Sequence, residues 1–376
     1  LREQDVHDAA AALIEDGVDA IVCSLLFSYR NPAHEARVGE LLRAAVAESG
    51  REIPVMLSSE LYPTRRDLPR LNSTVIEAYA AEPSRATLRS ISDRTREDGA
   101  NFELRVMASH GGTISIDAKE LGTTLISGPI GGVVGAQWLA RHLELDNILC
   151  TDIGGTSFDI ALITEGRFEV TPTPDMARFV LNMPLVKIDS LGAGCGSYVR
   201  VDPASRRPEM GPDSAGAAVG VCNPESGVET VSVTDLNLLL GRLNPDYFLG
   251  GEVTLDVERA RHAVEQQIAR PMGLSVDDAA SGIVDLFESK LRNEAVGRVL
   301  GKGYSPAEYT LLCYGGGGPL HVAGYTKGVP FEQVLIPAWA AGFSAFGCAC
   351  ADFEYRYDRT VDLPLLPGAP PEGVAG

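Results

Sequence analysis

The first sixty or so residues alternate between helical and strand-like spacing of their apolar positions. Apolar residues recur at helical spacing from Leu1 to about Glu15, an apolar run fills Ala20–Ser28, and helical spacing returns over Pro32–Ala47. A second short apolar run covers Ile53–Leu57. Short apolar runs between amphipathic stretches are typical of strands in an α/β fold. The pattern therefore predicts helix, strand, helix, strand.

The next stretch predicts one long helical region and a second α/β unit. Helical spacing covers Asn72–Asp98, and we expect an interruption near Pro83 because proline lacks a backbone donor. A strand is predicted at Leu104–Ala108, followed by the glycine turn Ser109–Gly112. SGPIGGVVGAQWLARHL, Ser127–Leu143, then predicts a glycine turn that leads into a helix.

The second half of the chain predicts hairpins beside helices. Three strands are expected over Asn147–Val170, with a tight turn at Gly154-Gly155. Two helices are predicted at Glu258–Ala269 and Val276–Val299, and a further strand at Thr310–Tyr314. Repeated hairpins next to helices favour a mixed sheet over a purely parallel one.

Composition excludes several classes of protein. The 376 residues are 45% hydrophobic and 22% charged, which excludes a disordered chain and fits two domains or one large one. A formal charge of −19 argues against nucleic acid or an anionic membrane as the main partner. No apolar run approaches the ~18–20 residues of a membrane span, and no signal peptide opens the chain, so we expect a cytoplasmic protein. The seven cysteines lack zinc-site spacing, and most are expected to be buried thiols.

The strongest candidate site is the sequence DIGGTSFD between two apolar strands. It brings two acids, two glycines and two hydroxyls into eight residues: Asp152, Gly154, Gly155, Thr156, Ser157 and Asp159. A turn built on the two glycines exposes consecutive backbone amides, and the hydroxyls add donors where a phosphate could bind. Asp152 is placed to hold a Mg²⁺-bound water or to orient a nucleophile, and the two acids are the candidate catalytic residues. The alternative is a plain hairpin with an Asx turn.

A second candidate is CYGGGGPLH, residues 313–321. Its glycines follow a strand and precede a helix expected to start near Pro319, and they are Gly315, Gly316, Gly317 and Gly318. Such a loop lets a phosphorylated or flat ligand lie against the backbone, although no Walker motif follows. The alternative is a flexible connection. His321 could serve in capping or packing as readily as in catalysis.

Three further glycine-rich turns are weaker candidates. GAGCGS, Gly192–Ser197, superficially resembles a dinucleotide fingerprint, but its third glycine comes too early and a strand-like run follows, which excludes NAD binding. Cys195 has no histidine nearby in the sequence, so we interpret it as a small residue in a turn rather than a nucleophile. SGPIGG, Ser127–Gly132, and GPDSAGA, Gly211–Ala217, could each contact a ligand.

The order of these motifs resembles the hydantoinase A/oxoprolinase family. LLFSYRNPAHEARV (Leu25–Val38), LSSELYPTRRDLPRLNSTVIEAY (Leu57–Tyr79) and TVSVTDLNLLLGRLNPDYFLGG (Thr230–Gly251) extend the resemblance over nearly the whole chain. Members of the family are similar to actin, Hsp70 and sugar kinases. The resemblance therefore implies an α/β fold in which two ribonuclease-H-type domains with mixed sheets clasp ATP in the cleft between them.

The resemblance also implies the role of each motif. Asp152 and residues 154–157 would form the second phosphate loop, and Gly315–Gly318 would lie at the adenosine. The first phosphate loop would precede Leu1, which implies a fragment of a longer chain. Residues 1–125 would then be the last part of the N-terminal domain, 126–362 the core ATPase domain, and 363–376 a linker to a further region.

The family implies an ATP-hydrolysing, phosphoryl-transferring subunit that uses Mg²⁺ and activates a small-molecule carbonyl substrate. A hydantoinase B-like subunit or domain would be its partner in a hetero-oligomer. The chain departs from the common hydantoinase pattern with Phe158 in place of Thr, Cys195 in place of Gly, and Gly317 and Val322 in place of Ala. Phe158 and the run Leu181–Pro203 resemble the acetone and acetophenone carboxylase branch. The alternatives are a hydantoinase or 5-oxoprolinase acting on cyclic amides, and a nucleotide-gated binding protein.

Overall fold

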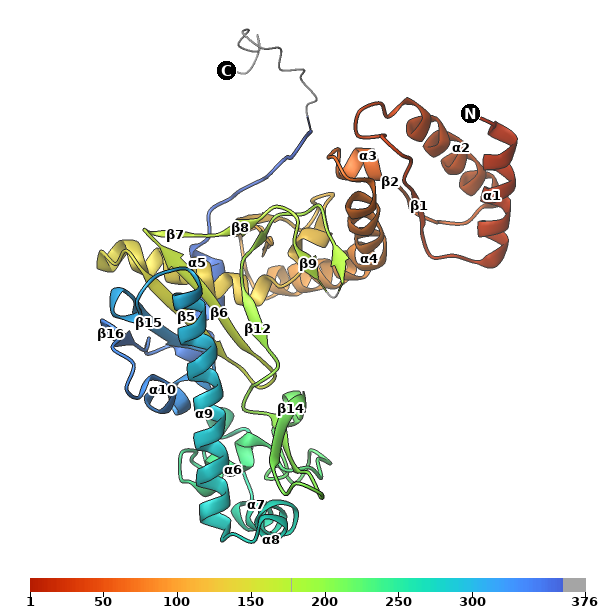
Figure 1. Ribbon diagram of the computed structural model, residues 1–376. Helices are drawn as coiled ribbons and strands as arrows, with labels where there is room; N and C mark the ends of the chain where they lie inside the picture. The colour runs from red at the N-terminus through yellow and green to blue at the C-terminus, as the bar shows by residue number, and fades with distance from the viewer. Residues whose placement is uncertain (177, 361–376) are drawn as a thin grey trace. The chain divides into compact units, whose positions relative to one another are not determined.

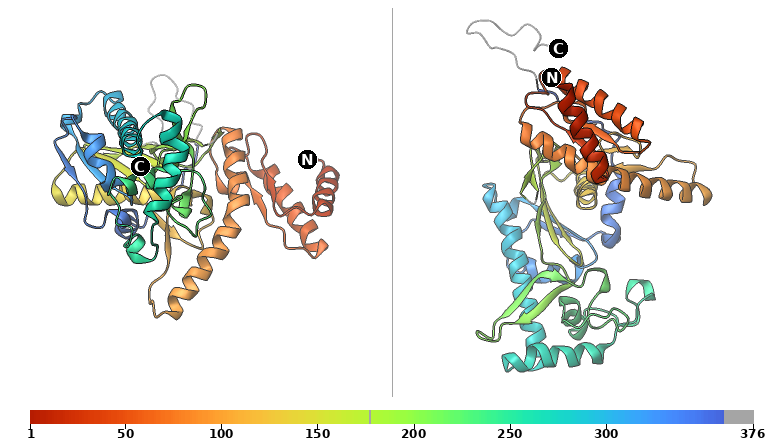
Figure 2. Two further views of the ribbon diagram at one scale, coloured as in Figure 1. Left: turned by 90° about the horizontal axis from the view of Figure 1, so that it is seen from below. Right: turned by 90° about the vertical axis from the view of Figure 1, so that its right-hand side faces the viewer.

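The computed structural model describes residues 1–176 and 178–360 (Figures 1 and 2). The chain forms two compact units. Among the described residues, the first comprises Leu1–Ser127, Val170–Val186 and Asp352–Thr360, and the second comprises Gly128–Glu169 and Lys187–Ala351. The segment 363–376, predicted to be a linker, lies outside the described residues, and the division into family domains stays a prediction.

The first unit begins with a small α/β layer in the predicted order. Its elements are α1 (Glu3–Asp16), β1 (Ile21–Cys23), α2 (Ala33–Ser49) and β2 (Val55–Leu57). The two strands pair in parallel. Ala10 of α1, Leu42 of α2 and Leu57 of β2 are buried together in one apolar cluster with the strands. The helices therefore bury their apolar faces on the two strands.

The strand β1 is shorter than the predicted run Ala20–Ser28, because buried polar groups turn the chain after Cys23. The carboxylate of Glu35 accepts hydrogen bonds from the amides of Leu25 and Ser59, each at 2.7 Å. Arg70, with no exposed surface, donates to the Ser58 hydroxyl at 2.9 Å and to the Leu25 carbonyl at 2.8 Å. These bonds hold the ends of both strands together.

Helix α4 (Asp67–Glu97) follows the short helix α3 (Ser58–Leu61) and continues through Pro83, so the expected interruption there is wrong. Proline removes one backbone donor from a helix, but tertiary contacts anchor both sides of it. Ala81 is buried, and the Arg85 guanidinium donates to the carbonyls of Ile116 and Ala118 at 2.9 and 3.0 Å.

Short strands complete the first unit. They are β3 (Arg105–Met107), β4 (Thr113–Ser115), β8 (Val170–Thr171), β9 (Asp175–Met176), β10 (Phe179–Val180) and β11 (Leu185–Val186), with the 3-10 turn η1 (Leu121–Thr124). β3 and β4 form an antiparallel pair around the predicted glycine turn. The amide of Thr113 in β4 donates to the carbonyl of Asp352 at 2.9 Å. The chain after residue 351 therefore returns to this hairpin.

The second unit is built on a six-stranded mixed sheet of order β12-β6-β5-β15-β16, with β7 on β6 (Figure 1). The strands are β5 (Ile148–Ile153), β6 (Phe158–Thr164), β7 (Arg167–Phe168), β12 (Asp189–Leu191), β15 (Thr310–Tyr314) and β16 (Gln333–Leu335). β15 is parallel to β5 and β16, whereas β6 is antiparallel to β5, β7 and β12. The mixed sheet predicted from the sequence is confirmed.

Helices cover both faces of this sheet. Leu149 and Ile153 of β5 share a buried cluster with Phe287 of α9 (Val276–Gly301). On the opposite face, the ring of Tyr314 in β15 packs 4.8 Å from that of Phe343 in α11 (Phe343–Cys350). Because side chains alternate along a strand, the carboxyl ends of β5 and β15 lie between two helical layers.

The glycines predicted to form a turn at Ser127–Gly132 instead lie inside helix α5 (Ser127–Leu143). A Cβ atom on Gly131 would lie 2.5 Å from the Ser344 carbonyl oxygen, and one on Gly347 would lie 1.7 Å from the Gly131 carbonyl oxygen. Glycine at these positions lets the backbones of α5 and α11 approach each other closely. The turn prediction failed because the partner helix lies far away in the sequence.

The second unit also contains two further strands, several helices and short turns. They are β13 (Ser197–Val201), β14 (Pro208–Ser214), α6 (Val233–Leu239), α7 (Val257–Val264), the π-helical turn η4 (Glu265–Ala269), α8 (Arg270–Met272) and α10 (Gly318–Thr326), with the 3-10 turns η2 (Gly216–Ala218), η3 (Leu249–Gly251), η5 (Pro306–Glu308) and η6 (Ala340–Gly342). The predicted helices at 258–269 and 276–299 are confirmed. Among the described residues, no helix combines the length and apolar character needed to cross a bilayer.

All seven cysteines are free thiols. Four are buried and three are partly exposed. Burial raises the pKa of every one of them, for example to about 11 for Cys23 and Cys313. The sequence prediction that most are buried thiols is confirmed.

Candidate functional site

The DIGGTSFD sequence forms the tip of the β5–β6 hairpin, as predicted. The last strand pair is Ile153 with Phe158, and the amide of Gly154 donates to the Ser157 carbonyl at 3.1 Å to close the turn. Gly155 and Thr156 at the tip are exposed. Their amides donate to no acceptor within residues 1–176 and 178–360. Two adjacent free amides beside a hydroxyl are suited to binding phosphate oxygens.

The two predicted acids face each other across this hairpin. Asp152 and Asp159 are paired in register on β5 and β6. The hydroxyl of Ser344 donates to Asp152 Oδ2 at 3.2 Å, and that of Ser157 donates to Asp159 Oδ2 at 2.9 Å. Burial and the charge of Asp159 raise the pKa of Asp152 to about 6, against the lowering effect of Ser344. The turn therefore carries closely spaced carboxylates at its base.

The acid pair fits a magnesium ion held with a phosphate better than a closed metal site. No group of three or more His, Cys, Asp or Glu side chains suited to a metal occurs in the described part of the chain. Mg²⁺ does not need one, since it usually binds one or two carboxylates and takes its other ligands from water and phosphate. A divalent cation would also relieve the repulsion between Asp152 and Asp159.

The GAGCGS loop holds the turn in place. The amide of Cys195 donates to the Gly154 carbonyl at 3.0 Å, and that of Gly196 donates to the Gly155 carbonyl at 2.7 Å. A Cβ atom on Gly194 would lie 2.5 Å from the Gly155 carbonyl carbon. The glycines of this loop thus permit close contact with the turn, which explains them without a dinucleotide.

The GPDSAGA turn, Gly211–Ala217, also lies beside the tip of the β5–β6 hairpin. The amide of Ala215 donates to the Gly196 carbonyl at 2.9 Å. The Gly216 carbonyl oxygen would lie 3.5 Å from a Cβ atom on Gly155. The structure therefore brings this turn beside the turn Gly154–Ser157, which we call the phosphate turn after the role proposed for it below.

The glycine loop after β15 meets the turn from the neighbouring parallel strand. Asp152 and Tyr314 are paired in register, and the amide of Gly317 donates to the Ile153 carbonyl at 2.8 Å. The Gly316 amide finds no acceptor among the described residues, and a Cβ atom on Gly316 would have no neighbour within 4 Å. Gly315, with φ of 82°, and Gly318, the first residue of α10, complete the loop. Ligands commonly bind at the carboxyl ends of parallel strands, where this loop lies.

Two models of one protein family match the chain. The hydantoinase/oxoprolinase family model matches residues 70–357, and the model of the hydantoinase/oxoprolinase N-terminal region matches residues 1–46. The chain belongs to the hydantoinase/oxoprolinase family. The resemblance inferred from its motifs is confirmed.

Individual relatives are enzymes. The chain is 55% identical over 365 residues to the acetone carboxylase beta subunit of Xanthobacter autotrophicus, covering 97% of this chain and 51% of that subunit. It is 34% identical over 368 residues to the caprolactamase subunit alpha of Pseudomonas jessenii, covering 97% and 52%. A nucleotide-free structure of acetone carboxylase, from work on ATP-dependent acetone carboxylation, matches with a TM-score of 0.88 at 55% identity, covering 98% of this chain and 52% of the other. The chain thus spans about half the length of these relatives.

His321 lies in the core of this family member rather than at the turn. Its Nδ1 is 3.0 Å from Glu288 Oε1 and 3.3 Å from the Arg242 guanidinium, and its Nε2 is 3.0 Å from the Asn237 amide nitrogen. The ring has no exposed surface. These contacts favour the packing interpretation of His321 over the catalytic one.

The motifs did not point to Ser344 or Ala340. Ser344 is the partner of Asp152, and the Ala340 carbonyl accepts from the Gly315 amide at 2.9 Å. Both lie in an apolar stretch that gives no motif. Only the fold brings that stretch to the carboxyl end of β5.

Substituting Ser344 by Ala tests the electrostatic link to Asp152. The Ser344 hydroxyl lowers the pKa of the Asp152 carboxyl by binding its charged form. Its loss is expected to raise that pKa, so the titration of the Asp152 carboxyl, followed by its carbon-13 NMR signal, should move to higher pH. Ser344→Cys, which keeps a weak donor, should give a smaller change. An unchanged titration in both variants would show that Ser344 does not affect the pKa of Asp152.

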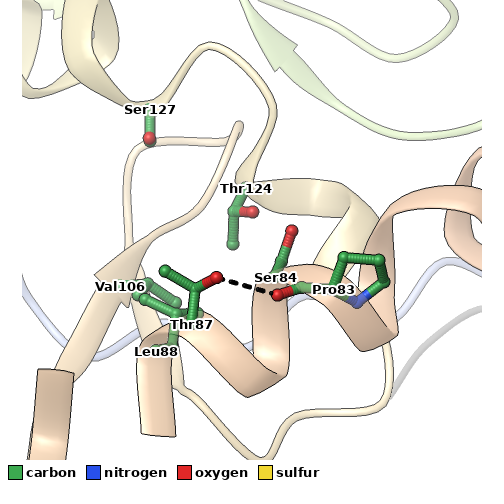
Figure 3. A pocket seen from close by; sticks show the side chains of 7 residues that line it. All are labelled: Pro83, Ser84, Thr87, Leu88, Val106, Thr124 and Ser127. Atoms are coloured by element: carbon green, nitrogen blue, oxygen red, sulfur yellow. Dashed lines mark hydrogen bonds between the residues drawn. The ribbon is translucent and has the colours of Figure 1, made fainter. Parts of the chain in front are cut away.

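A cavity of about 400 Å³ in the first unit is distinct from this site (Figure 3). Its lining consists of Pro83, Ser84, Thr87, Leu88, Val106, Thr124 and Ser127. The Thr87 hydroxyl donates to the Pro83 carbonyl at 3.0 Å. The lining offers hydroxyls and apolar groups without a charged side chain. Ser127, the first residue of SGPIGG, is its one member from the candidate motifs.

Proposed function

We propose that the full-length protein is an ATP-hydrolysing subunit of a ketone carboxylase that activates a small-molecule carbonyl substrate by phosphoryl transfer. The observation that carries the proposal is the convergence of the phosphate turn, the acid pair and the glycine loop at the carboxyl ends of β5 and β15. This arrangement occurs in a chain that is 55% identical to an acetone carboxylase beta subunit.

In this proposal each part of the site has one task. The amides of Gly155 and Thr156, with the Thr156 and Ser157 hydroxyls, bind phosphate oxygens. Gly315–Gly318 lie along the nucleotide, with the Gly316 amide open to it. Asp152, with its partner Asp159, orients the attacking oxygen. Bound Mg²⁺ would supply positive charge against the phosphates.

In the proposed reaction, phosphorylation converts an oxygen of the substrate or of bicarbonate into part of a leaving group. The α-proton of a ketone passes to a general base, and the enolate oxygen, or an oxygen of bicarbonate, attacks the γ-phosphorus of ATP. The bond to the ADP oxygen breaks, ADP leaves, and the new O–P bond turns a poor leaving oxygen into a phosphate. The role of this chain is to position the groups and to stabilise the charge that develops.

The partner completes the reaction in this proposal. Both relatives described above are named as subunits, which supports a hetero-oligomer with a hydantoinase B-like subunit or domain. The ribonuclease-H-type kinship of the domains with actin, Hsp70 and sugar kinases, and a cytoplasmic location, belong to the same proposal.

A second candidate is an ATP-dependent hydrolase of cyclic amides. The 34% identity to a caprolactamase subunit favours it, and the same site could phosphorylate a lactam oxygen. The higher identity to the acetone carboxylase subunit supports the carboxylase. A nucleotide-gated binding protein without chemistry has no comparable support, since the relatives named above are enzymes.

Substrate-dependent ATP consumption separates these candidates. With the full-length protein and its partner, ATP consumption is expected only when ketone and bicarbonate are both present, and labelled bicarbonate should appear in an acid product. The control replaces the ketone by a lactam or hydantoin without bicarbonate. Ring opening of the cyclic amide without labelled acid would assign the hydrolase instead, and ATP turnover independent of every substrate would favour the binding protein.

A further inference from the structure

A space the size of one side chain separates the phosphate turn from the glycine loop, and the thiol of Cys195 occupies it. A Cβ atom on Gly317 would lie 2.3 Å from Cys195 Sγ and 3.2 Å from a methyl carbon of Ile153. Carbon and sulfur atoms in van der Waals contact stand well over 3 Å apart. With the sulfur of Cys195 in its present position, position 317 therefore has no room even for a methyl group.

Neither backbone is free to move away. The Cys195 amide donates to the Gly154 carbonyl at 3.0 Å, and its carbonyl accepts from the Thr234 amide at 2.7 Å and hydroxyl at 2.9 Å. On the other side, the Gly317 amide donates to the Ile153 carbonyl at 2.8 Å. Cysteine has only three staggered positions for its sulfur. Both backbones are thus anchored, and a side chain at position 317 could be accommodated only if the sulfur of Cys195 turned to another staggered position.

The chemistry of Cys195 points to a steric role. Burial raises the pKa of its thiol to about 12, so the group is neutral at physiological pH. A neutral thiol is a poor nucleophile and a poor metal ligand. What remains is its volume, at the place where the two ligand-binding loops meet.

We infer that Cys195 is a positioning residue whose thiol sets the separation between the glycine loop and the phosphate turn. It fixes where the open amide of Gly316 stands relative to those of Gly155 and Thr156, and positions 195 and 317 share one side-chain volume. The consequence for nucleotide affinity rests on the proposed function, whereas the steric coupling does not.

A double-mutant cycle on the full-length protein with its partner tests this inference. Gly317→Ala is expected to raise the KM for ATP at least tenfold and to lower the unfolding temperature. Cys195→Gly, which leaves the space empty, should raise KM severalfold. The double variant again carries one side chain there and should return KM to within about threefold of the parent. The matched control is Gly297→Ala in α9, where a Cβ atom would meet nothing within 4 Å.

The two readouts separate this inference from the proposed function. Additive effects on both KM and unfolding temperature would overturn the inference. Coupling in the unfolding temperature, measured without nucleotide, would support the shared volume even if the parent protein consumed no ATP, a result that would overturn the proposed function alone. If Gly317→Ala is insoluble, recovery of soluble protein in the double variant supports the inference, and continued insolubility contradicts it.

Discussion

Substitution of Asp152 by Asn is expected to lower ATP turnover by the full-length protein about 10²-fold or more. The carboxylate stands at the end of β5, opposite Asp159 and beside the open amides of the phosphate turn. Asparagine keeps the shape but loses the charge that would orient the attacking oxygen and hold a metal-bound water. Turnover is measured by phosphate release in the presence of the partner and substrate.

The same substitution is expected to stabilise the folded protein at neutral pH. The pKa of Asp152 is raised from an ordinary 3.8 to about 6, so the folded state holds its proton more tightly than the unfolded state. The free energy of unfolding of the parent should therefore fall as pH rises from about 4 through about 6, by roughly 1.4 kcal/mol for each pH unit within that range. Asp152→Asn removes that loss, so its unfolding temperature should exceed that of the parent at pH 8.

The stability difference between Asp152→Asn and the parent should disappear near pH 4. At that pH the Asp152 carboxyl of the folded parent is protonated and, like the asparagine of the variant, carries no charge. Asp159→Asn is the matched control, since removing the neighbouring charge is expected to lower the pKa of Asp152. Unchanged turnover in Asp152→Asn would remove this residue from the mechanism. A lower unfolding temperature of Asp152→Asn than of the parent at pH 8 would show that the folded protein stabilises the charge of Asp152 rather than disfavouring it.

Gly347→Ala is expected to destabilise the second unit by about 3 kcal/mol, at the upper end of the usual cost of overpacking. A Cβ atom there would lie 1.7 Å from the Gly131 carbonyl oxygen, which is backbone and cannot rotate away. Helices α5 and α11 would have to separate. Because α11 carries Ser344, the partner of Asp152, ATP turnover should fall together with stability.

Denaturant unfolding of Gly347→Ala, compared with that of the parent and of a control variant, measures this loss of stability. Gly282→Ala in α9 is the control, since its Cβ atom would meet nothing within 4 Å. Alanine favours the helix over glycine by up to about 1 kcal/mol, so that control should be neutral or slightly stabilised. Equal stability of Gly347→Ala and the parent would contradict the close approach of the helices.

Local patterns in the sequence predicted most of the elements and the two loops of the candidate site. The phosphate turn and the glycine loop are each encoded within a few consecutive residues, and their strands are short apolar runs. The roles of Asp152, Asp159 and the glycines in binding and catalysis stay predictions. Their spatial convergence follows from the parallel pairing of β5 with β15, which no single motif encodes.

The wrong predictions concern residues whose structural role depends on contacts with a segment far away in the sequence. The glycines of α5 suggested a turn, but they are needed for contact with α11, more than two hundred residues later. Pro83 suggested a break, but Arg85 ties its helix to the segment after β4. Cys195 and Gly317 belong to motifs more than a hundred residues apart, but the fold puts the sulfur of Cys195 where a side chain at position 317 would lie.

The raised thiol pKa values have a practical consequence for spectroscopy. Maleimides and iodoacetamides react with thiolates, and burial disfavours that form for all seven native thiols. A cysteine introduced at an exposed position away from the candidate site would retain ordinary reactivity, and Gly297→Cys in α9 is such a change, since a Cβ atom there would meet nothing within 4 Å. Because Cys348 and Cys350 are partly exposed, these two would be replaced first. A dye or spin label could then be attached at one chosen place while Cys195 stays in position.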